Sequence, residues 1–494
     1  MLLMSEKVIV VGSGIAGIAT SIRLAQKGYD VHVFESNAYP GGKLSAFKLG
    51  AYRFDAGPSL FTMPHFVEEL FELCDEDPQM HFEYKKKEVG CNYFWEDGTR
   101  LKAYDNPKKF LSEVENVLGV APEVLKKYWV KAKKKYDLTE SIFLKSSLHQ
   151  IKSYLNLDTL KAILSIRVLE IGKSLHQVNQ EQLKEPHLVQ FYDRFATYNG
   201  SNPYQTPGIM TLVQHLEGHY GTFVPDLGMD SITTSLYELA KRQGVKFSFN
   251  EKVEEILVEE NKTIGVRTAK DFYNSNIVCS NMDVYPTYKY LLPKTPAPNK
   301  ILNQERSSSA IIFYLGISKT FEELDLHNIF FTADYKVEFK SIFEDQTVTQ
   351  DPTVYINISS KDVTQDAPSG CENWFVMINT PSDKGQDWEQ IRDAVRASFV
   401  KKINRILGVD IEDYIVEEDC LTPPLIQQKT QSHQGALYGS SSNNKMAAFL
   451  RHPNFSQQIK NLYFCGGSVH PGGGIPLCLL SAKIVSDQMP TLKL

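Results

Sequence analysis

Cysteine is scarce and scattered in this chain of 494 residues. The seven cysteines are odd in number, widely spaced, and include no C-x-x-C pair. That pattern excludes a disulfide framework and a cysteine-based zinc site, and it favours a reducing compartment. The sequence also lacks an H-E-x-x-H motif, a P-loop and a G-x-S-x-G nucleophile elbow, so we expect no metal site and no hydrolase chemistry of those classes.

An excess of positive charge is missing as well. The chain has 53 Lys and Arg against 59 Asp and Glu, which gives a formal net charge of −6. A general nucleic-acid-binding protein would normally be basic, so we expect no nucleic-acid partner. The hydrophobic fraction of 42% excludes a disordered chain. The length suggests about three structural units and is ample for a large core.

Long hydrophobic runs are absent too. Residues 462–482 carry no Lys, Arg, Asp or Glu, but glycines and two prolines interrupt them. They are typical of a buried strand, a loop and the start of a helix rather than of a membrane span. The N-terminal residues MLLMSEKVIVVGSG leave no room for a signal peptide. We therefore expect a cytoplasmic protein.

The first 35 residues predict a strand, a turn, a helix and a second strand. Residues 7–11 form an apolar run typical of a strand buried on both faces. A glycine turn over 12–17 follows, then a predicted helix over 15–27. A second apolar strand over 31–34 ends at Glu35, 21 positions after Gly14. This arrangement is typical of a dinucleotide-binding unit.

The residue types of that unit match the needs of a dinucleotide. Gly12 permits the tight turn, Gly14 lets a pyrophosphate approach the backbone, and Gly17 lets the helix and strand pack closely. The helix N-terminus offers free N–H groups to phosphates, and a carboxylate at the second strand can accept hydrogen bonds from ribose hydroxyls. The predicted nucleotide-binding residues are Gly12, Ser13, Gly14, Ile15, Ala16, Gly17, Glu35 and Ser36.

Further glycine clusters favour FAD over a nicotinamide dinucleotide. A second glycine turn covers 41–43, directly after Glu35, and Gly57 lies in the segment 52–59. Such turns suit a chain that runs close to the ribityl chain and the flavin ring.

Near the C-terminus, a predicted strand over 461–464 leads into a glycine loop and a helix over 477–489. Pro476 fits its first turn, and the helix N-terminus would favour negative charge on a reduced flavin.

These motifs resemble a known superfamily. Residues 12–17, 35, 41–43 and 54–59 resemble the FAD fingerprint of flavin amine oxidases and carotenoid desaturases. HPGGGIPLCLLSAK, residues 470–483, resembles the C-terminal signature of bacterial phytoene desaturase-type enzymes. Gly467 stands where amine oxidases have an acid, which disfavours an amine oxidase. With RFATYNGSNPY at 194–204, the chain looks most like the 1-hydroxycarotenoid 3,4-desaturase branch.

The resemblance implies an α/β fold with three parts. The Rossmann-like FAD-binding domain, of the glutathione reductase/amine oxidase type, comprises 1–75, 220–290 and 455–494. A mixed-sheet substrate-binding domain comprises 76–109 and 291–454, and a helical, membrane-facing subdomain comprises 110–219. Within these parts, hydrophobic patterns predict strands over 245–249, 253–258, 264–268, 276–281, 311–317, 354–358 and 374–379, and helices over 232–242 and 386–407.

The resemblance also implies further site residues. The additional FAD-binding residues are Gly41, Gly42, Lys43, Gly57, Pro58, Ser59, Val253, Gly466, Gly474 and Ile475. For Val253, plain strand packing is as good an interpretation as contact with adenine. Arg194 and Tyr198 are expected near the substrate channel, although a helix end followed by an Asn-Pro turn explains that segment equally well.

The region predicted to be helical carries an excess of positive charge. From Lys126 to Lys173 there are eleven basic and four acidic residues. Six lysines at 126, 127, 131, 133, 134 and 135 alternate with aromatic and apolar residues, and apolar residues recur over 155–169. Basic and apolar residues together suit an anionic membrane surface, although a solvated lysine-rich face is the alternative. We expect peripheral membrane association.

The expected reaction is FAD-dependent desaturation of a long apolar polyene. A hydride leaves an allylic carbon for flavin N5 and a proton leaves the neighbouring carbon. The proton acceptor is His470, Asp55 or solvent, and reoxidation uses oxygen or a membrane quinone. The alternatives are a phytoene desaturase, a retinol saturase-like enzyme, an amine oxidase, and a flavin-free prenyl-lipid-binding protein on the same fold.

Overall fold

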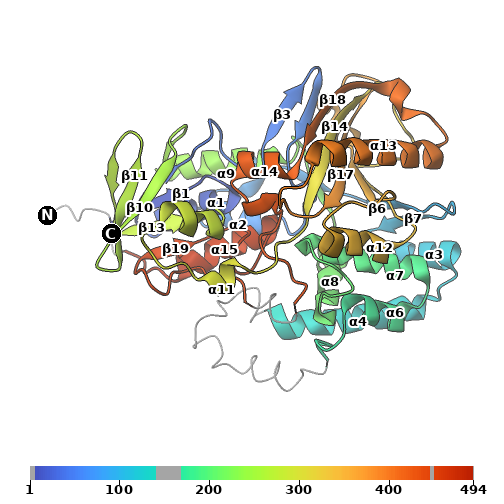
Figure 1. Cartoon of the computed structure of the whole chain (residues 1–494), viewed down its shortest axis with the longest axis horizontal. Helices are drawn as coiled ribbons and strands as arrows, with labels where there is room; N and C mark the ends of the chain where they lie inside the picture. The colour runs from blue at the N-terminus through green and yellow to red at the C-terminus, as the bar shows by residue number, and fades with distance from the viewer. Residues whose placement is uncertain (1–5, 141–167, 445–449, 493–494) are drawn as a thin grey trace.

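The computed structural model describes residues 6–140, 168–444 and 450–492. Two sheets lie at opposite ends of the molecule, and a group of helices lies beside the second sheet (Figure 1). Both ends of the chain lie at the side of the first sheet. The predicted α/β class is confirmed, with one parallel and one mixed sheet.

The first sheet is parallel and five-stranded, in the order β19-β13-β1-β2-β9. Its strands come from all three chain segments assigned to the FAD domain: β1 (Lys7–Val11), β2 (Asp30–Phe34), β9 (Lys246–Ser248), β13 (Ile277–Ser280) and β19 (Leu462–Phe464). One face is covered by α1 (Ile15–Gln26), α2 (His65–Glu72), α9 (Asp230–Arg242) and α15 (Ile475–Asp487). The other is covered by β10 (Val253–Glu259), β11 (Lys262–Thr268) and β12 (Phe272–Asn274).

The packing of strand β1 explains why its residues do not alternate between polar and apolar. Val8 and Val10 pack with the helices, whereas Ile9 and Val11 pack with the three-stranded sheet. Successive side chains of a strand point to opposite faces, so a strand covered on both faces is apolar throughout. The predicted strand, helix and second strand are confirmed within one residue at each end.

The second sheet is mixed and seven-stranded, in the order β18-β14-β17-β16-β15-β6-β7. Only the pairing of β15 with β6 is parallel among these seven described strands. The strands are β6 (Val89–Phe94), β7 (Arg100–Tyr104), β14 (Ser309–Ile317), β15 (His327–Phe330), β16 (Val354–Asn357), β17 (Glu372–Thr380) and β18 (Ile415–Leu421). Helix α13 (Trp388–Leu407) covers one face, where it packs against alternate residues of β14.

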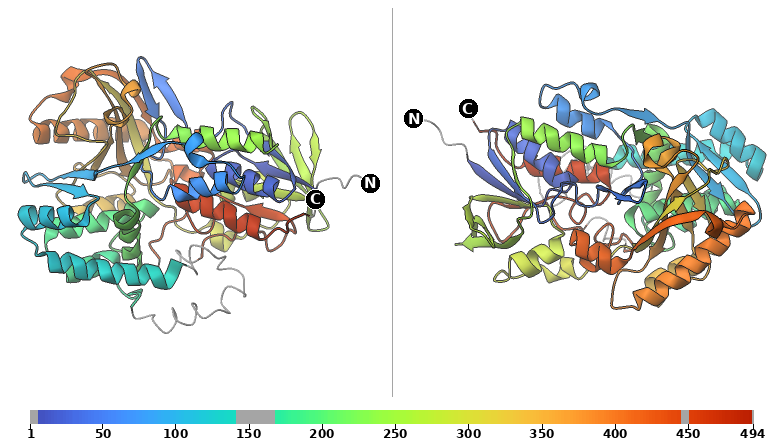
Figure 2. Two further views of the ribbon diagram at one scale, coloured as in Figure 1. Left: turned by 180° about the vertical axis from the view of Figure 1, so that it is seen from behind. Right: turned by 90° about the horizontal axis from the view of Figure 1, so that it is seen from above.

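Two separate antiparallel strand pairs and several helices complete the fold. The pairings are β3 (Ala46–Leu49) with β4 (Tyr52–Asp55), and β5 (Tyr84–Lys86) with β8 (Phe223–Pro225). The helices are α3 (Pro107–Leu118), α4 (Pro122–Thr139), α6 (Leu175–Leu183), α7 (Pro186–Asp193), α8 (Val213–Tyr220), α10 (Val284–Pro286), α11 (Asn299–Leu302), α12 (Tyr335–Lys340) and α14 (Pro423–Thr430). The helices α3, α4, α6, α7 and α8 lie together beside the second sheet in both views of Figure 2.

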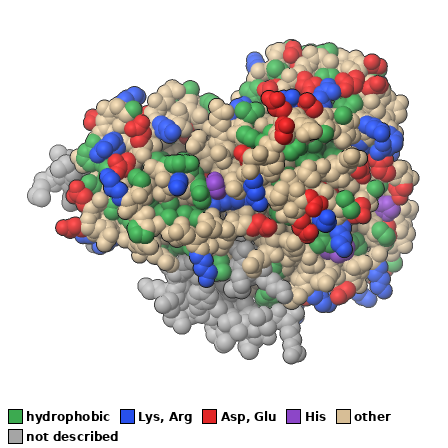
Figure 3. Space-filling model, viewed as in Figure 1, with side chains coloured by type: hydrophobic (Ala, Val, Ile, Leu, Met, Phe, Trp, Pro, Cys, Tyr) green, Lys and Arg blue, Asp and Glu red, His purple; other side chains and the backbone are tan. Residues whose placement is uncertain are grey.

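The described residues of the segment 110–219 are mostly helical, whereas their assignment to a separate subdomain stays a prediction. No helix in the described part of the chain is long and apolar enough to cross a bilayer. The apolar recurrence predicted over 155–169 lies outside the described residues except for its last two positions. On the face of the molecule in Figure 3, acidic and basic side chains are interspersed. The exact domain boundaries stay predictions.

One of the six clustered lysines is not on the surface. Lys135 is only 1% exposed. Its Nζ donates hydrogen bonds to the carbonyl oxygen of Gly208 at 2.9 Å and to Thr211 at 2.8 Å, and it pairs with Glu170 at 2.6 Å. The expectation of a membrane-facing role is therefore wrong for Lys135, because its charge is already neutralised inside the helical region. The other five lysines are exposed.

Candidate active site

A cavity of about 760 Å³ joins the first sheet to the second. At one end it is lined by the glycine turns, and at the other by the face of the seven-stranded sheet opposite α13. All the predicted site residues line it except Ser13, Gly17 and Asp55. The structure therefore places the predicted residues of both glycine turns, Val253 and the C-terminal loop around one cavity, and their contact with FAD stays a prediction.

The first glycine turn is held by backbone contacts. Gly12 donates to the carbonyl oxygen of Phe34 at 2.8 Å, and the turn passes directly into α1. A Cβ atom on Gly17 would lie 2.2 Å from the carbonyl oxygen of Gly12. Gly17 therefore stays out of the cavity and serves the close packing of α1 on β1, as predicted. Gly14, Ile15 and Ala16 at the start of α1 line the cavity, and the free N–H groups of a helix start would stabilise phosphates there.

Glu35 is buried at the carboxyl end of β2, beside this turn. One of its carboxylate oxygens accepts hydrogen bonds from the backbone N–H of Ser13 at 2.8 Å and from its hydroxyl at 2.9 Å. The other accepts from the N–H of Asn37 at 2.8 Å and from the Ser36 hydroxyl at 3.2 Å. The two serine hydroxyls can rotate away, so the carboxylate can exchange these bonds for ribose hydroxyls.

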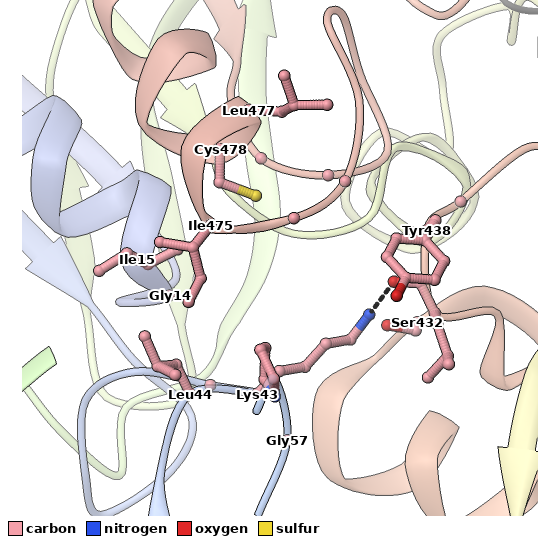
Figure 4. Close-up of a pocket in the computed structure, with 18 of the residues that line it drawn as sticks. Gly14, Ile15, Lys43, Leu44, Gly57, Ser432, Tyr438, Ile475, Leu477 and Cys478 are labelled. Atoms are coloured by element: carbon pink, nitrogen blue, oxygen red, sulfur yellow. Dashed lines mark hydrogen bonds between the residues drawn. The ribbon is translucent and has the colours of Figure 1, made fainter. Parts of the chain in front are cut away.

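The second glycine turn lies against the first. Gly41 donates to the carbonyl oxygen of Ser13 at 2.8 Å. From here Lys43 points across the cavity, and its Nζ donates to the carbonyl oxygen of Leu437 at 3.0 Å, as Figure 4 shows. Burial lowers the pKa of Lys43, although Asp283 opposes the shift. A cation held this way can be stabilised further by an anionic ligand.

Gly57 lines the cavity, but the approach of a flavin is not the only reason that this position needs a glycine. A Cβ atom there would lie 2.1 Å from the carbonyl oxygen of Lys43. The sequence analysis attributed this glycine to the close approach of a flavin. The structure shows that the approach of the protein's own backbone at Lys43 already requires it. Pro58 and Ser59 continue along the wall.

The C-terminal loop forms the opposite wall. Gly466 and Gly474 line the cavity, and Ile475 lies above the first glycine turn in Figure 4. Gly474 precedes α15 with φ near 103°, and Pro476 occupies the first turn of that helix, as predicted. A Cβ atom on Gly474 would meet nothing within 4 Å. This open space, with a helix N-terminus at its edge, fits the pyrimidine side of a flavin ring.

The sequence analysis missed Arg451. This arginine is 3% exposed and lines the cavity. It donates to three carbonyl oxygens, those of Tyr438 at 2.8 Å, Ser440 at 2.9 Å and Gly467 at 3.2 Å. Burial lowers its pKa to about 10. Its partners in those hydrogen bonds are all neutral, which leaves its charge available to an anion. No local motif marks it, because the carbonyl groups come from separate loops.

Asn281 is a second residue that connects the walls. It follows β13, and its N–H donates to the carbonyl oxygen of Val11 at 2.8 Å. Its side chain donates to the carbonyl oxygen of Cys465 at 3.3 Å. A Cβ atom on Gly14 would lie 2.6 Å from its Oδ1. Asn281 therefore fixes the distance between the first glycine turn and the C-terminal loop.

The two candidate proton acceptors lie in different environments. His470 lines the cavity and is 2% exposed. Its backbone N–H donates to the carbonyl oxygen of His452 at 3.0 Å. Asp55 lies outside the lining. Its carboxylate pairs with Arg53 at 2.9 Å and accepts from the N–H groups of Met229 and Asp230 at 2.9 and 3.1 Å. Burial raises its pKa, although Arg53 opposes the shift.

Asp55 therefore has a structural position. Arg53 also pairs with Asp366 at 3.1 Å and with Asp230. These contacts join β4 to the start of α9 and to the loop that carries Asp366, whose side chain is fully buried. The expectation that Asp55 is a proton acceptor finds no support in this geometry, because its oxygens are engaged away from the cavity.

Arg194 and Tyr198 meet on the helical side of the cavity. Arg194 donates to Tyr198 Oη at 2.8 Å. Its guanidinium lies 4.5 Å from the ring centre of Phe195 and 5.2 Å from that of Tyr93. Such contacts stabilise a buried cation. Both predicted channel residues lie in the lining, as the sequence analysis expected.

The sheet side of the cavity is mostly apolar. Ile312 and Tyr314 of β14 and Phe375 and Met377 of β17 face it, because the alternate residues of these strands face α13. The polar residues on this side include Asn379 of β17, Thr353, and His327 and Tyr355, of which the last two lie on neighbouring strands. Among the described residues there is no cluster of His, Cys, Asp and Glu that could hold a metal ion.

The site thus fits a long dinucleotide that carries a ring. Glycine turns, two helix N-termini, Glu35 and the cations Lys43 and Arg451 can hold its phosphates, ribose and ring. The apolar sheet face beyond them can hold a water-free, elongated hydrocarbon. No disulfide joins any of the seven cysteines, all of which lie within the described residues.

Comparison with known sequences agrees with this geometry. The profile described as flavin containing amine oxidoreductase matches residues 15–490. The chain is 53% identical over 485 residues to a 1-hydroxycarotenoid 3,4-desaturase of Flavobacterium sp. (strain P99-3), and the match covers 98% of this chain and 99% of that one. It is 31% identical to a 4,4'-diaponeurosporene oxygenase of Staphylococcus aureus (strain MSSA476), with 98% of each chain covered.

Solved structures share the fold at low sequence identity. A redesigned putrescine oxidase matches with a TM-score of 0.64 at 13% identity, over 98% of each chain. Cyclohexylamine oxidase of Brevibacterium oxydans matches with a TM-score of 0.60 at 15% identity, over 98% of this chain and 99% of that one. At these identities the likeness concerns the fold alone, and it confirms the predicted amine oxidase type of architecture.

Proposed function

The chain belongs to the flavin containing amine oxidoreductase family, and on that premise we propose that it desaturates a long apolar polyene, by 3,4-desaturation of a 1-hydroxycarotenoid in carotenoid biosynthesis. It is an oxidoreductase with FAD as its cofactor. The proposal follows from the cavity that joins a dinucleotide-binding turn to an apolar sheet face. The desaturase that is 53% identical over nearly the whole chain supports the substrate class.

The protein's own residues hold and orient the reactants. When bound, FAD supplies the acceptor for a hydride from an allylic carbon, while a proton leaves the neighbouring carbon. Lys43 and the start of α15 fix the ring end of the cofactor site, and Ile312 and Phe375 offer an apolar wall to the polyene. This wall excludes water from the reacting carbons, which favours hydride transfer over side reactions.

Of the two candidate proton acceptors, the geometry supports His470 better than Asp55. It lies on the cavity wall, in the loop before α15, whereas Asp55 does not reach the cavity. Water at the cavity mouth is the alternative acceptor. We propose oxygen or a membrane quinone as the final electron acceptor of the reaction.

We also propose that helix α4 contacts an anionic membrane surface, because the substrate is soluble in lipid. Lys127, Lys131 and Lys134 are exposed along it, and Val130 between them is 68% exposed. Basic and apolar groups that share one surface suit an interface with anionic lipids. A protein held there can take an apolar polyene from the bilayer without passing it through water.

An anaerobic titration tests the reaction. Protein reconstituted with FAD is mixed with a 1-hydroxylated acyclic carotenoid in liposomes, and absorbance is recorded. We expect the flavin absorbance to bleach while the polyene band moves to longer wavelength, since the conjugated system gains one double bond. A flavin that stays oxidised with this substrate would contradict the proposal, and phytoene, retinoids and amines would be tested next.

A further inference from the structure

A short line of hydrogen-bonded side chains crosses the cavity face of the second sheet. Ser59 Oγ lies 2.7 Å from Tyr355 Oη, and Tyr355 Oη lies 2.7 Å from His327 Nδ1. All three residues line the cavity. His327 and Tyr355 lie on the antiparallel neighbours β15 and β16, on the face opposite α13. The line ends at the second ring nitrogen of His327.

The neighbouring Asn357 determines which ring nitrogen carries the proton. Its amide Nδ2 donates to the carbonyl oxygen of Leu326 at 3.0 Å, which fixes the orientation of the amide. The same nitrogen lies 3.3 Å from His327 Nδ1. Two N–H groups would repel each other there, so Nδ1 is an acceptor and Nε2 carries the proton. Tyr355 then donates to Nδ1, and Ser59 donates to Tyr355.

The imidazole is neutral and its N–H is buried. Burial lowers the pKa of His327 to about 3, and Lys87 acts in the same direction. The side chain is 3% exposed, and Nε2 has no hydrogen-bond partner among residues 6–140, 168–444 and 450–492. A buried N–H without an acceptor is unfavourable. This unpartnered N–H, on a residue that lines the cavity, is a donor that a ligand oxygen can satisfy if it displaces the packing around Nε2, and the imidazole is too weak a base to take the substrate proton.

His327 lies on the cavity wall and is linked through Tyr355 to the loop assigned to the flavin. Ser59 belongs to the loop assigned to the flavin, and it lies two hydrogen bonds away from His327. In a 1-hydroxylated polyene the hydroxyl oxygen is three bonds from C3, so the two atoms lie on the order of 4 Å apart. A group that binds this hydroxyl must therefore lie close to the flavin ring. Apolar residues such as Ile329 and Phe375 line the cavity around it.

We propose that His327 is the specificity-determining residue, which donates a hydrogen bond from Nε2 to the hydroxyl oxygen at C1 of the polyene. Tyr355 and Ser59 are positioning residues, because they hold the ring by its other nitrogen. This inference rests on the proposed 3,4-desaturation. It assigns the polar end group of the substrate to one atom of the cavity wall.

The test compares two polyenes that differ only in the 1-hydroxyl group. We measure anaerobic flavin reduction with each, and independently the dissociation constant of each from quenching of tryptophan fluorescence. The variants are His327→Phe, which keeps a ring and removes the donor, and His327→Gln, which keeps an N–H donor. Tyr355→Phe removes the hydroxyl that holds Nδ1. Flavin content and the oxidised flavin spectrum are recorded for every variant.

We expect wild-type protein to prefer the hydroxylated polyene in both kcat/KM and affinity. His327→Phe should lower kcat/KM for that polyene about ten- to a hundredfold, mainly through KM, and should leave the polyene without the hydroxyl unchanged. His327→Gln should restore most of the preference, and Tyr355→Phe should lower it only a fewfold. If His327→Phe holds no flavin, the test uses the other proteins. The preference for the hydroxylated polyene should then be strongest in wild type, slightly lower in His327→Gln and lower by a few times in Tyr355→Phe.

Equal losses on the two polyenes would overturn the inference and leave the desaturase proposal intact. So would a changed spectrum of the oxidised flavin in His327→Phe, because the N–H would then belong to the cofactor. If wild-type protein reduces its flavin with neither polyene, the proposed function fails. The dissociation constants then still decide whether His327 recognises the hydroxyl.

Discussion

The two ends of the cavity are built in different ways. At the nucleotide end, much of the wall is backbone: glycine turns, helix N-termini and carbonyl oxygens from short continuous segments, to which a few side chains such as Glu35 and Arg451 are added. At the substrate end, the walls are side chains from strands far apart in the sequence, such as His327 and Tyr355. A backbone wall has no side chains that can adapt, so one added carbon atom blocks it. A side-chain wall can be changed residue by residue without loss of the fold.

The largest expected effect is at the nucleotide end. Gly14→Val should abolish FAD binding, because its side chain would collide with Asn281 and occupy the approach of the pyrophosphate. Flavin content after reconstitution measures this. The matched control is Gly172→Val, since a Cβ atom at Gly172 meets nothing within 4 Å. Normal flavin content in Gly14→Val would refute the assignment of the turn.

The next largest effect, a loss of folding stability, is expected where the two ends of the cavity join. Arg53→Met should leave Asp55 and Asp366 buried without their cation, and should destabilise the protein by about 3–5 kcal/mol. Urea unfolding followed by flavin fluorescence and by far-UV circular dichroism measures this. Arg392→Met, at an exposed pair with Asp393, should change stability by about 0–1 kcal/mol. Similar losses in both variants would show that the buried cluster does not join the two ends.

A further prediction concerns the substrate end alone. Burial raises the pKa of Glu338 from 4.5 to about 7. An acid whose pKa is raised on folding stabilises the fold below pH 4.5, and this stability is lost as pH rises through 7. The loss amounts to about 3 kcal/mol. Glu338→Gln should therefore match wild type near pH 4 and be more stable near pH 8.

Unfolding midpoints across this pH range check the expectation, and FAD affinity should not change. The side-chain amide that Glu338→Gln introduces can still accept from the Thr353 N–H, which contacts the native carboxyl group at 3.1 Å. Parallel pH profiles for the two proteins would contradict the raised pKa. A change in FAD affinity would mean that the two ends of the cavity are not separate in the way described.

The smallest effect is expected outside the cavity. Replacement of Lys127, Lys131 or Lys134 by Gln should each weaken binding to anionic liposomes by about 1 kcal/mol. Cosedimentation at several salt concentrations measures this. Lys401→Gln on α13, which is also exposed, is the control and should have no effect. Unchanged, salt-insensitive binding in the α4 variants would favour a solvated lysine face.

The same difference between the two ends explains what could be predicted from sequence. The nucleotide end is local: Gly12, Gly14 and Glu35 lie within one βαβ unit, so their spacing alone indicates their roles. Gly57 was predicted in the right place for an incomplete reason, because nothing in the sequence shows that Lys43 approaches it. Arg451 was missed since its three carbonyl partners lie in loops that meet only in the folded chain.

The substrate end could be predicted as strands but not as a site. The strands over 311–317, 354–358 and 374–379 were predicted from their apolar runs, and the structure confirms them. Strand β15 was missed because its four residues, His327–Phe330, are too few for a periodic pattern. Without β15, nothing in the sequence places His327 beside Tyr355, 28 positions later. Lys135 was misjudged because its partners Glu170 and Gly208 are also far from it in the sequence.

The order of strands in the first sheet has a consequence for biosynthesis. Its edge strand β19 and the glycine loop after it leave the ribosome long after the first glycine turn. The first glycine turn is complete early, but its opposite wall is made of residues 466–475. A nascent chain therefore carries half of the proposed cofactor site through most of translation, and we expect flavin to be captured only after α15 has been made. Premature termination anywhere before α15 would yield a protein that cannot retain FAD.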